Sequence, residues 1–451
     1  MVNRVLGGGI GLGLDRNIQS AYSWLCRNYQ PGDAIFLFGF SRGAYTVRSL
    51  GGLTTRCGLL DLTGVPDEEG WKRIETVFRN GYRARTETRE DWLKMGWKFH
   101  QSAPGSQDIG IHLIGVWDTV GALGIPDHLG VLNLLDDPEQ YRFHDTNLSK
   151  LVAHARHAIA LDEMRGAFQA TLWTKVEPGR DVKQVWFPGV HSDVGGGYVE
   201  TGLSDGALKW MVDEAAELGL GFDEQLVGQI KPDCRGLLHN SLDGVFKHLP
   251  TQPRSAPLLH EVSARLHASL VDRRKSPPIA QAPYGHSHAL KAGESVELPV
   301  FAINPWNPTG LWLEAGVTYR FAATGQWLDR KTPSGPEGLE DGKFEPSDIA
   351  LALGDMLGEA EILFKQITGN RATDFWGTKR HQDLKWFQLV GAIANGAGED
   401  EEMGSDELIS IGKGCDYTPK RSGYLWAYAN DAWSFYGNNR GSVQLTVTRP
   451  N

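Results

Sequence analysis

Short apolar runs alternate with helical periodicity through the first half of the chain. Three runs have the length and mainly apolar character of buried strands, at 34–38, 109–117 and 183–190. Segments with the pattern of helices lie before and between these runs, at 15–29, 44–50, 148–158 and 204–218. Strands that alternate with helices in this way predict a parallel α/β sheet.

The pattern changes after about residue 250. Residues 251–292 are rich in proline and have few periodic apolar positions, which is typical of a linker or an irregular cover segment. Beyond them, apolar and polar residues alternate as in half-buried antiparallel strands, at 295–301, 318–323, 424–428 and 442–448. One helix, at about 347–366, interrupts these strands. The predicted organisation is an α/β domain at 1–250, the linker or cover at 251–292 and a β-sandwich at 293–451.

The composition is that of an ordinary globular protein, with 41% hydrophobic and 22% charged residues. A formal net charge of −10 argues against non-specific electrostatic binding of nucleic acid, so no nucleic-acid partner is expected. The four cysteines lie far apart and form no C-x-x-C pair, which indicates neither a zinc site nor a disulfide framework. No apolar run is long enough for a transmembrane helix, and no signal-peptide pattern opens the chain. We therefore expect a protein made in the cytoplasm.

The sequence Gly39-Phe-Ser-Arg-Gly43 lies between the first apolar run and the helix that follows it. This strand–turn–helix context is the one that a G-x-S-x-G nucleophile elbow requires. Glycine is expected on both sides of the serine because so tight a turn leaves no room for side chains there. The turn would expose the Ser41 hydroxyl and let the backbone N–H of Arg42 point at an oxyanion. The alternative is a glycine-rich turn between a buried strand and its helix.

A serine nucleophile needs a base within hydrogen-bond reach and an acid that orients the base. Asp118 and His191 each follow a buried strand, and their chain order after Ser41 is the one that α/β-hydrolases use. Active sites of open parallel sheets lie at the carboxyl ends of the strands, where all three residues are expected. Asp193 is an alternative orienting acid, a turn cap or a cation ligand. Asp118 could instead cap a helix or turn, and His191 could be a structural loop histidine.

Four separated motifs occur in the order found in one α/β-hydrolase family. They are Gly-Phe-Ser-Arg-Gly-Ala at 39–44, Val-Trp-Asp-Thr-Val at 116–120, Ala-Leu-Asp-Glu at 160–163 with Arg165 and Phe168, and Trp-Phe-Pro-Gly-Val-His-Ser-Asp-Val-Gly-Gly-Gly-Tyr at 186–198. Residues 7–215 thus resemble the family that includes the phospholipase effectors of bacterial type VI secretion. The resemblance implies a serine esterase that cleaves phospholipid or another carboxylic ester, with Ser41, Asp118 and His191 as its triad. It further implies export by a type VI system, with a secretion-machinery partner or an immunity protein.

The start of the chain departs from that family. Its members usually open with a strand ending in an Asp-Gly-Thr-Trp-like motif, ahead of the segment that here begins with the glycine-rich stretch 7–13. That strand end is the expected source of a second oxyanion donor, and loss of one such donor costs about 100–1000-fold in rate. A shortened reading frame, a split protein or an impaired enzyme would each explain the difference. We interpret 7–13 as a loop into the helix at 15–29, since neither a preceding strand nor a following Lys-Ser/Thr pair marks a phosphate cradle.

The loop at 430–442 gathers oxygen-bearing side chains ahead of the last predicted strand. Such oxygens suit Ca²⁺, although Asn and Gly also favour an ordinary polar hairpin loop. Together with the motifs at 304–310, 335–338 and 386–391, this loop makes 293–449 resemble the calcium-dependent galactose-binding lectins of bacteria. The resemblance implies calcium ligation by Asp431, Asn438, Asn439 and the Phe435 carbonyl, with a carbohydrate held through the ion.

Two functions compete on this reading of the sequence. The first is a lipolytic serine hydrolase with a C-terminal targeting module. The second is a calcium-dependent glycan- or surface-binding protein whose hydrolase domain is truncated and inactive. The intact Ser41, Asp118 and His191 favour the enzyme, and the missing opening strand favours the binding protein.

Overall fold

The computed structural model describes residues 9–106, 108–120, 147–243, 250–259, 263–281, 284–339, 379–396, 405–433 and 435–451. The chain divides into two compact units. The first contains the described residues up to Ser241 together with 263–281, and the second contains the rest. The segment 251–292, predicted as a linker or cover, carries helix α8 (Ala268–Lys275) in the first unit and strand β5 (His288–Ala289) in the second.

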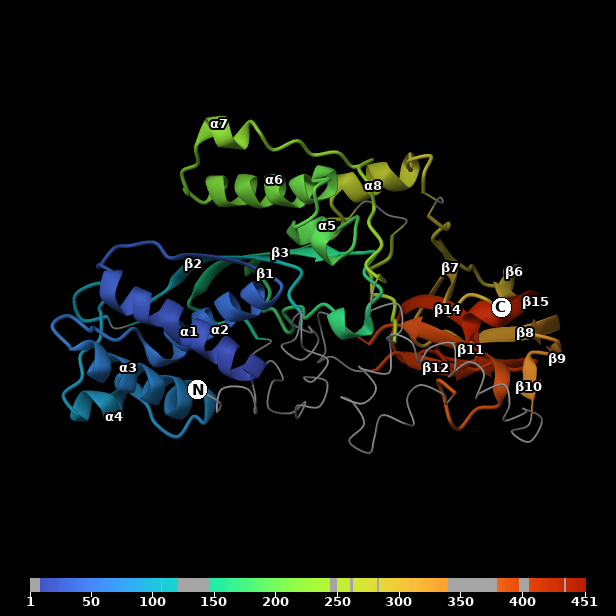
Figure 1. Cartoon of the computed structure of the whole chain (residues 1–451), viewed down its shortest axis with the longest axis horizontal. Helices are drawn as coiled ribbons and strands as arrows, with labels where there is room; N and C mark the ends of the chain where they lie inside the picture. Colours follow the sequence, from blue (N-terminus) through green and yellow to red (C-terminus); the bar gives the residue numbers. More distant parts are fainter. Residues whose placement is uncertain are drawn as a thin grey trace, which may run out of the picture. The chain divides into compact units, whose positions relative to one another are not determined.

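A parallel sheet of four strands, in the order β1-β2-β3-β4, forms the centre of the first unit (Figure 1). The strands are β1 (Phe36–Phe40), β2 (Ile111–Trp117), β3 (Val152–Ala160) and β4 (Asp181–Phe187). Helices on one face are α1 (Gly9–Asn28), α2 (Arg42–Cys57), α3 (Asp67–Thr76) and α4 (Arg89–Lys94), with a π-helical turn at Val77–Arg83. Helices on the other face are α5 (His191–Gly195), α6 (Gly202–Glu217), α7 (Glu224–Val227) and α8. This layered α/β architecture confirms the predicted fold class.

Two local predictions in the first unit are wrong. Residues 148–158 were expected to be helical, but Val152–Ala160 form β3, which pairs with β2 on one side and β4 on the other. Its four alanines and Arg156 have helix propensity, and burial in the middle of the sheet overrides it. The glycine-rich stretch 7–13 is also not wholly a loop, because α1 begins at Gly9.

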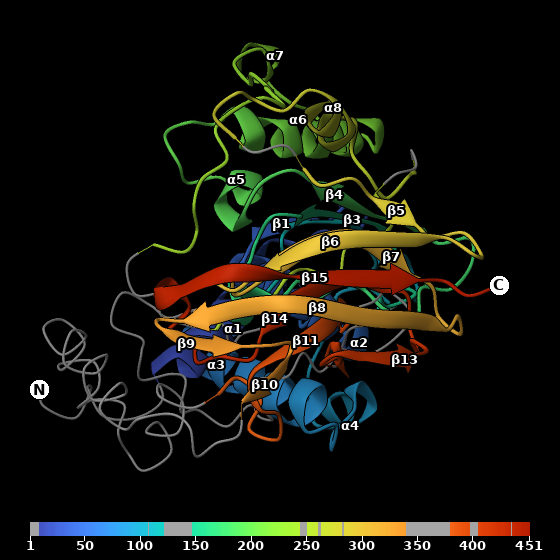
Figure 2. The same cartoon turned by 90° about the vertical axis from the view of Figure 1, so that its right-hand side faces the viewer.

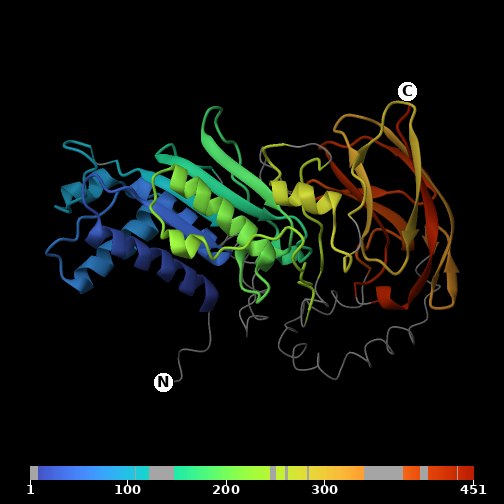
Figure 3. The same cartoon turned by 90° about the horizontal axis from the view of Figure 1, so that it is seen from above.

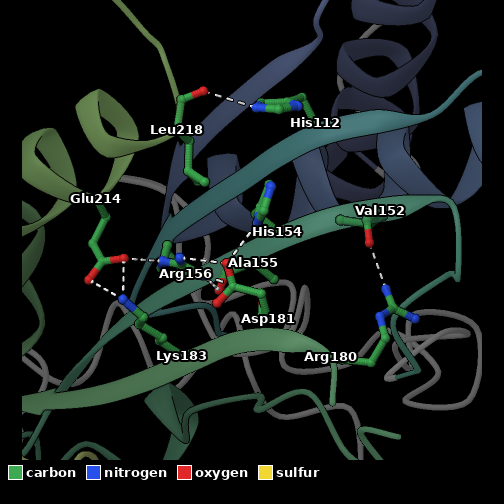
Figure 4. Close-up of polar contacts among 10 residues, drawn as sticks. All are labelled: His112, Val152, His154, Ala155, Arg156, Arg180, Asp181, Lys183, Glu214 and Leu218. Atoms are coloured by element: carbon green, nitrogen blue, oxygen red, sulfur yellow. Dashed lines mark hydrogen bonds and ion pairs between the residues drawn. The ribbon is translucent and has the colours of Figure 1, made fainter. Parts of the chain in front are cut away.

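A network of ion pairs and hydrogen bonds lies on the face of the sheet that α6 covers (Figure 4). His154 and Arg156 lie two positions apart on β3, so their side chains share one face of the sheet. Both reach Asp181 of β4, at 2.6 and 2.8 Å. Arg156 and Lys183 both bind Glu214 of α6. Arg156 is only 3% exposed, and each of its charged partners is an acid, so the pairing offsets the cost of its burial. The network fixes the register between the two strands and holds α6 on the sheet.

The second unit is a sandwich of two largely antiparallel sheets (Figures 2 and 3). One sheet has the order β10-β11-β14-β7-β5 with β12 on β11, and the other has the order β13-β8-β15-β6 with β9 on β8. Its strands, besides β5, are β6 (Ser295–Phe301), β7 (Asn307–Leu313), β8 (Tyr319–Asp329), β9 (Thr332–Ser334), β10 (Glu337–Leu339), β11 (Trp386–Ala394), β12 (Glu407–Ser410), β13 (Gly414–Tyr417), β14 (Gly423–Ala429) and β15 (Asn439–Thr448). The four strands predicted in this unit all exist.

Inward-facing side chains of both sheets form one core in the second unit. Trp327 of β8 packs edge-on against Phe387 of β11, with ring centroids 6.2 Å apart. Val443 and Leu445 of β15 join the same buried cluster. The β-sandwich prediction is therefore confirmed, whereas the helix expected at about 347–366 lies outside the described residues.

Candidate active site

The turn between β1 and α2 carries Ser41 in a strained backbone conformation. Its φ is 58° and its ψ is −120°, values that a residue with a side chain rarely adopts. The Ser41 N–H donates to the Trp117 carbonyl at the end of β2, at 3.1 Å, which ties the turn to the neighbouring strand. The backbone geometry is that of a sharp strand-to-helix turn, as a nucleophile elbow requires.

The two glycines of the turn have different reasons to be glycine. A Cβ at Gly39 would lie 2.3 Å from the carbonyl oxygen of Gly43, so a side chain cannot fit there. A Cβ at Gly43 would meet nothing within 4 Å, so the prediction that both positions exclude side chains is wrong for Gly43. Arg42 is the first residue of α2, where backbone N–H groups point out of the helix end. That position suits an oxyanion donor.

Asp118 follows β2 directly and is fully buried, with a positive φ of 37°. Its N–H donates to the Ala158 carbonyl at 2.7 Å, and its Oδ1 accepts the N–H of Ala160 at 2.9 Å. Its Oδ2 is 2.7 Å from His191 Nδ1. One carboxylate oxygen therefore holds the backbone of β3, and the other is left to orient the imidazole of His191.

His191 is the first residue of α5 and follows β4. Its ring lies 4.5 Å from that of Phe40, the residue before Ser41, and 5.0 Å from that of Phe168. A Cβ at Gly195 would lie 1.9 Å from the Phe40 ring, so glycine lets α5 approach the elbow closely. No hydrogen bond joins Ser41 to His191 in the described part of the chain. Such contacts are often loose in enzymes without substrate.

Among the described residues, the Asp193 carboxylate makes no hydrogen bond to the imidazole of His191. Its Oδ1 is 2.6 Å from Nδ1 of a different histidine, His239, and its Oδ2 accepts the N–H groups of Val190 and His239. His239 was not predicted, because no motif or periodicity marks its position in the sequence.

Glu163 also supports the turn that carries His191. It is fully buried, and its Oε2 accepts the His191 N–H at 3.2 Å. Arg165 binds both of its carboxylate oxygens, at 2.9 and 2.8 Å. The motif that the sequence presents at 160–168 thus contributes a buried acid that holds the backbone of α5.

The C-terminal loop places its four predicted calcium ligands close together. Asp431 is 1% exposed, and its Oδ2 accepts from Asn439 Nδ2 at 2.8 Å. The Phe435 carbonyl accepts the N–H of Asn438 at 3.2 Å. The Oδ1 atoms of Asn438 and Asn439 are buried and have no hydrogen-bond partner among the described residues. Asn439 contacts the buried carboxylate, and the orphaned amide oxygens of Asn438 and Asn439 are donors that suit a hard cation such as Ca²⁺.

A second carboxylate, which the sequence did not single out, lies beside this loop. Asp329 is the cross-strand partner of Asn439 and is 8% exposed. Burial raises the pKa of Asp431 to about 7, with a further rise from the charge of Asp329. Two buried carboxylates repel each other unless a cation or a proton lies between them. The described ranges contain no cluster of three His, Cys, Asp or Glu side chains that could hold a metal ion. Besides the two carboxylates, the donors at this loop would therefore be amide and carbonyl oxygens.

Two further predictions concern the start of the chain and membranes. The sequence lacks the opening strand that supplies a second oxyanion donor in the family it resembles. The residues before Gly9 lie outside the described ranges, so this stays a prediction. In the part of the chain that the structure covers, no helix has the length and apolar character needed to span a bilayer.

Residues 1–214 match the family model of the type VI secretion system (T6SS) phospholipase effector Tle1-like catalytic domain, which confirms the predicted resemblance. An uncharacterized protein of Saccharomyces cerevisiae is 33% identical over 163 residues, which are 36% of this chain and 22% of that protein. The chain therefore spans about a fifth of the length of this curated relative.

Three solved structures are similar at low identity. An uncharacterized protein from Pseudomonas aeruginosa is 18% identical, with a TM-score of 0.26, over 51% of this chain and 32% of that one. The Tle1 effector bound to the VgrG spike is 20% identical, with a TM-score of 0.21, over 42% of this chain and 30% of that one. The N-terminal domain of EclA, a PllA-like lectin, is 16% identical, with a TM-score of 0.21, over 34% of this chain and 94% of that one.

Proposed function

We propose that this chain, whose first 214 residues match the catalytic domain of Tle1-like T6SS phospholipase effectors, is a lipolytic serine hydrolase. Ser41 is the nucleophile, His191 the general base and Asp118 the acid that orients it. The observation that carries the proposal is the 2.7 Å contact between Asp118 Oδ2 and His191 Nδ1. It occurs beside a strained serine turn and within the segment that matches the family.

The proposed reaction is acyl transfer from an ester to Ser41 and then to water. Asp118 accepts the Nδ1–H of His191, so that Nε2 is free to take the proton of the Ser41 hydroxyl. As Ser41 Oγ bonds to the ester carbon, the N–H of Arg42 donates to the oxygen on which negative charge develops. His191 then returns the proton to the leaving alcohol. Water, deprotonated by the same nitrogen, releases the carboxylic acid and restores the serine.

The proposed substrate is a phospholipid, and the basis for this choice is the family match. The rings of Phe40 and Phe168 both contact the His191 ring. The surroundings of the general base are therefore apolar, which suits the acyl chain of a lipid better than a charged group. The family match also supports delivery by a type VI system, with a spike component or an immunity protein as partner.

The purified protein should release fatty acid from phosphatidylcholine and phosphatidylethanolamine vesicles and alcohol from a soluble chromogenic ester. Ser41→Ala should abolish both reactions, and so should His191→Ala, because the two residues act as one unit. The matched control is Ser204→Ala in α6, which should not change either rate. Hydrolysis that persists in Ser41→Ala would refute the proposal.

A second function is favoured by the C-terminal loop. We propose that the sandwich binds Ca²⁺ through Asp431, Asn438, Asn439 and the Phe435 carbonyl, with Asp329 as a further donor. The orphaned Oδ1 atoms of the two asparagines support this, because buried amide oxygens without partners are rare. A bound ion could in turn recruit the hydroxyls of a carbohydrate and direct the hydrolase to a surface.

Calorimetry on the full chain tests the calcium proposal. Ca²⁺ should bind with a single site and raise the melting temperature, because the folded state alone presents the site. Asp431→Ala should remove both effects and leave hydrolysis of a soluble ester unchanged, whereas Asp416→Ala, an exposed acid of β13, should bind as the original protein does. If millimolar Ca²⁺ gives neither heat nor a thermal shift, the loop is a polar hairpin.

A further inference from the structure

Asp193 and His239 form a second Asp–His pair that bears on the turn carrying His191. Asp193 is 2% exposed and lies in α5, two residues after His191. Its Oδ1 is 2.6 Å from His239 Nδ1, and its Oδ2 accepts the N–H of Val190 at 3.1 Å and that of His239 at 3.2 Å. One buried carboxylate therefore ties the short helix to a segment 46 residues further along the chain.

The imidazole of His239 is held on its other sides as well. Its Nε2 is 3.3 Å from Glu200 Oε2. Its ring stacks on Tyr198, with centroids 3.7 Å apart and planes at 11°. Tyr198 and Glu200 lie in the segment between α5 and α6, so this segment packs against the ring that anchors α5. These contacts fix the orientation of the His239 ring and thus the direction in which Nδ1 points.

The same segment makes a second tie to this turn. Ser241 donates through Oγ to Glu163 Oε1 at 3.0 Å, and Glu163 Oε2 accepts the N–H of His191 at 3.2 Å. His239 and Ser241 therefore bind the buried carboxylates of Asp193 and Glu163, respectively. Each of these carboxylates also accepts a backbone N–H at the start of α5. The two ties act on the element that must keep the imidazole of His191 in place.

We propose that His239 is a positioning residue for the hydrolase site, where it anchors Asp193 and so fixes the α5 turn that presents His191 to Ser41. The inference rests on the proposed function, since it takes His191 as the general base. His239 acts through Asp193 and does not touch the reacting atoms. A misplacement of a catalytic group by about 1 Å costs about 100-fold in rate, so loss of this anchor should lower kcat by about 10–100-fold with little change in KM.

Two substitutions at position 239 separate the Asp193 contact from the Glu200 contact. In His239→Asn the amide nitrogen takes the place of Nδ1 and can donate to Asp193. In His239→Gln it takes a place near Nε2, within reach of Glu200 but not of Asp193. We expect kcat to fall by about 10–100-fold in His239→Gln and to stay within about threefold in His239→Asn. Glu200→Gln, which changes only the outer contact, should behave as the original protein does.

Two readouts distinguish positioning from loss of fold and from failure of the proposed function. Labelling of Ser41 by a fluorophosphonate should slow in the same order as kcat. The low-field proton resonance of the His191–Asp118 hydrogen bond, assigned by its loss in His191→Gln, should shift or broaden in His239→Gln and persist in His239→Asn. This resonance reports on the position of His191 without any turnover. If His239→Gln does not fold, Asp193→Ala removes the same contact from the other side.

Equal losses in His239→Asn and His239→Gln would overturn the inference, because the contact with Asp193 would then not be the cause. An unchanged resonance and labelling rate in folded His239→Gln would overturn it as well. A protein with no Ser41-dependent hydrolysis, but with a resonance that responds to His239→Gln, would refute the proposed function and leave the positioning role intact.

Discussion

Asp118→Asn should nearly abolish hydrolysis without unfolding the protein. In the structure the Oδ1 of Asp118 accepts the Ala160 N–H at 2.9 Å, and Oδ2 faces His191 Nδ1 at 2.7 Å. An asparagine would keep its oxygen on the Ala160 side, because that N–H needs an acceptor. Its NH₂ group would then face His191 and donate to Nδ1. The proton of a neutral imidazole would move to Nε2, and His191 could no longer take a proton from Ser41.

The size of the loss has two contributions, the cost of restoring the active tautomer and the weaker support of the imidazolium. Turning the amide over would leave the Ala160 N–H without an acceptor at a fully buried site, which costs about 1–3 kcal/mol. The imidazolium that forms during the reaction would also lose a charge-assisted hydrogen bond, worth about 1.5–3 kcal/mol. The sum is about 3–6 kcal/mol. At 1.36 kcal/mol per tenfold change, kcat should fall by about 100- to 10,000-fold.

A soluble chromogenic ester gives kcat directly, and thermal unfolding checks that Asp118→Asn retains the fold. Asp213→Asn is the matched control, since the exposed Asp213 pairs with Lys209 one turn earlier on α6 and should leave the rate unchanged. The reasoning fails if Asp118→Asn stays within about threefold of the original protein. It also fails if Asp193→Asn loses more activity than Asp118→Asn, because the rate would then not depend mainly on the contact between Asp118 and His191.

Three further predictions test other parts of the structure. Gly39→Ala should abolish fluorophosphonate labelling, because its Cβ would lie 2.3 Å from the Gly43 carbonyl oxygen, whereas Gly43→Ala should be labelled normally. Arg156→Met removes one of the two cations that bind the buried Glu214. It should lower the free energy of unfolding in urea by about 3–5 kcal/mol. A loss below about 1 kcal/mol would show that the network contributes little to stability. Burial raises the pKa of Asp431 to about 7, so a proton competes with Ca²⁺ for this carboxylate below that pH. The calcium affinity should therefore fall about 100-fold from pH 8 to pH 5. An affinity independent of pH would exclude Asp431 as a ligand.

The elbow could be predicted from the sequence because its determinants are local. An apolar run, a glycine and a helix start within a few residues of one another are enough to define the turn at Ser41. Gly39 is required by contact with Gly43, four residues away, and a short-range pattern shows this. The strands of the sandwich are equally local, since each alternates with period two against a single core.

The rest could not be predicted because it depends on partners far apart in the chain. β3 has alanine and arginine residues that favour a helix, and its place between β2 and β4 makes it a strand. His239 and Asp193 are 46 residues apart, and neither lies in a periodic pattern that would indicate the other. Asp329 is similar, because it meets Asn439 only through the pairing of β8 with β15. Hydrophobic periodicity predicts the elements, but the choice of polar partners is made by the tertiary fold.

The register of the parallel sheet connects these local and distant determinants. Ser41 and Asp118 both have positive φ values, and each follows the last residue of a strand. The Ser41 N–H donates to the Trp117 carbonyl, and the Asp118 N–H donates to the Ala158 carbonyl. Each strained residue is thus held by the next strand in the sheet, in continuation of the pairing of Phe40 with Trp117 and of Trp117 with Ala158. A slip of one residue in either pairing would break these bonds and turn the side chains to the other face. The strain at the site is therefore maintained by the whole sheet, and substitutions that loosen β3 should lower activity even though they lie far from Ser41 in the sequence.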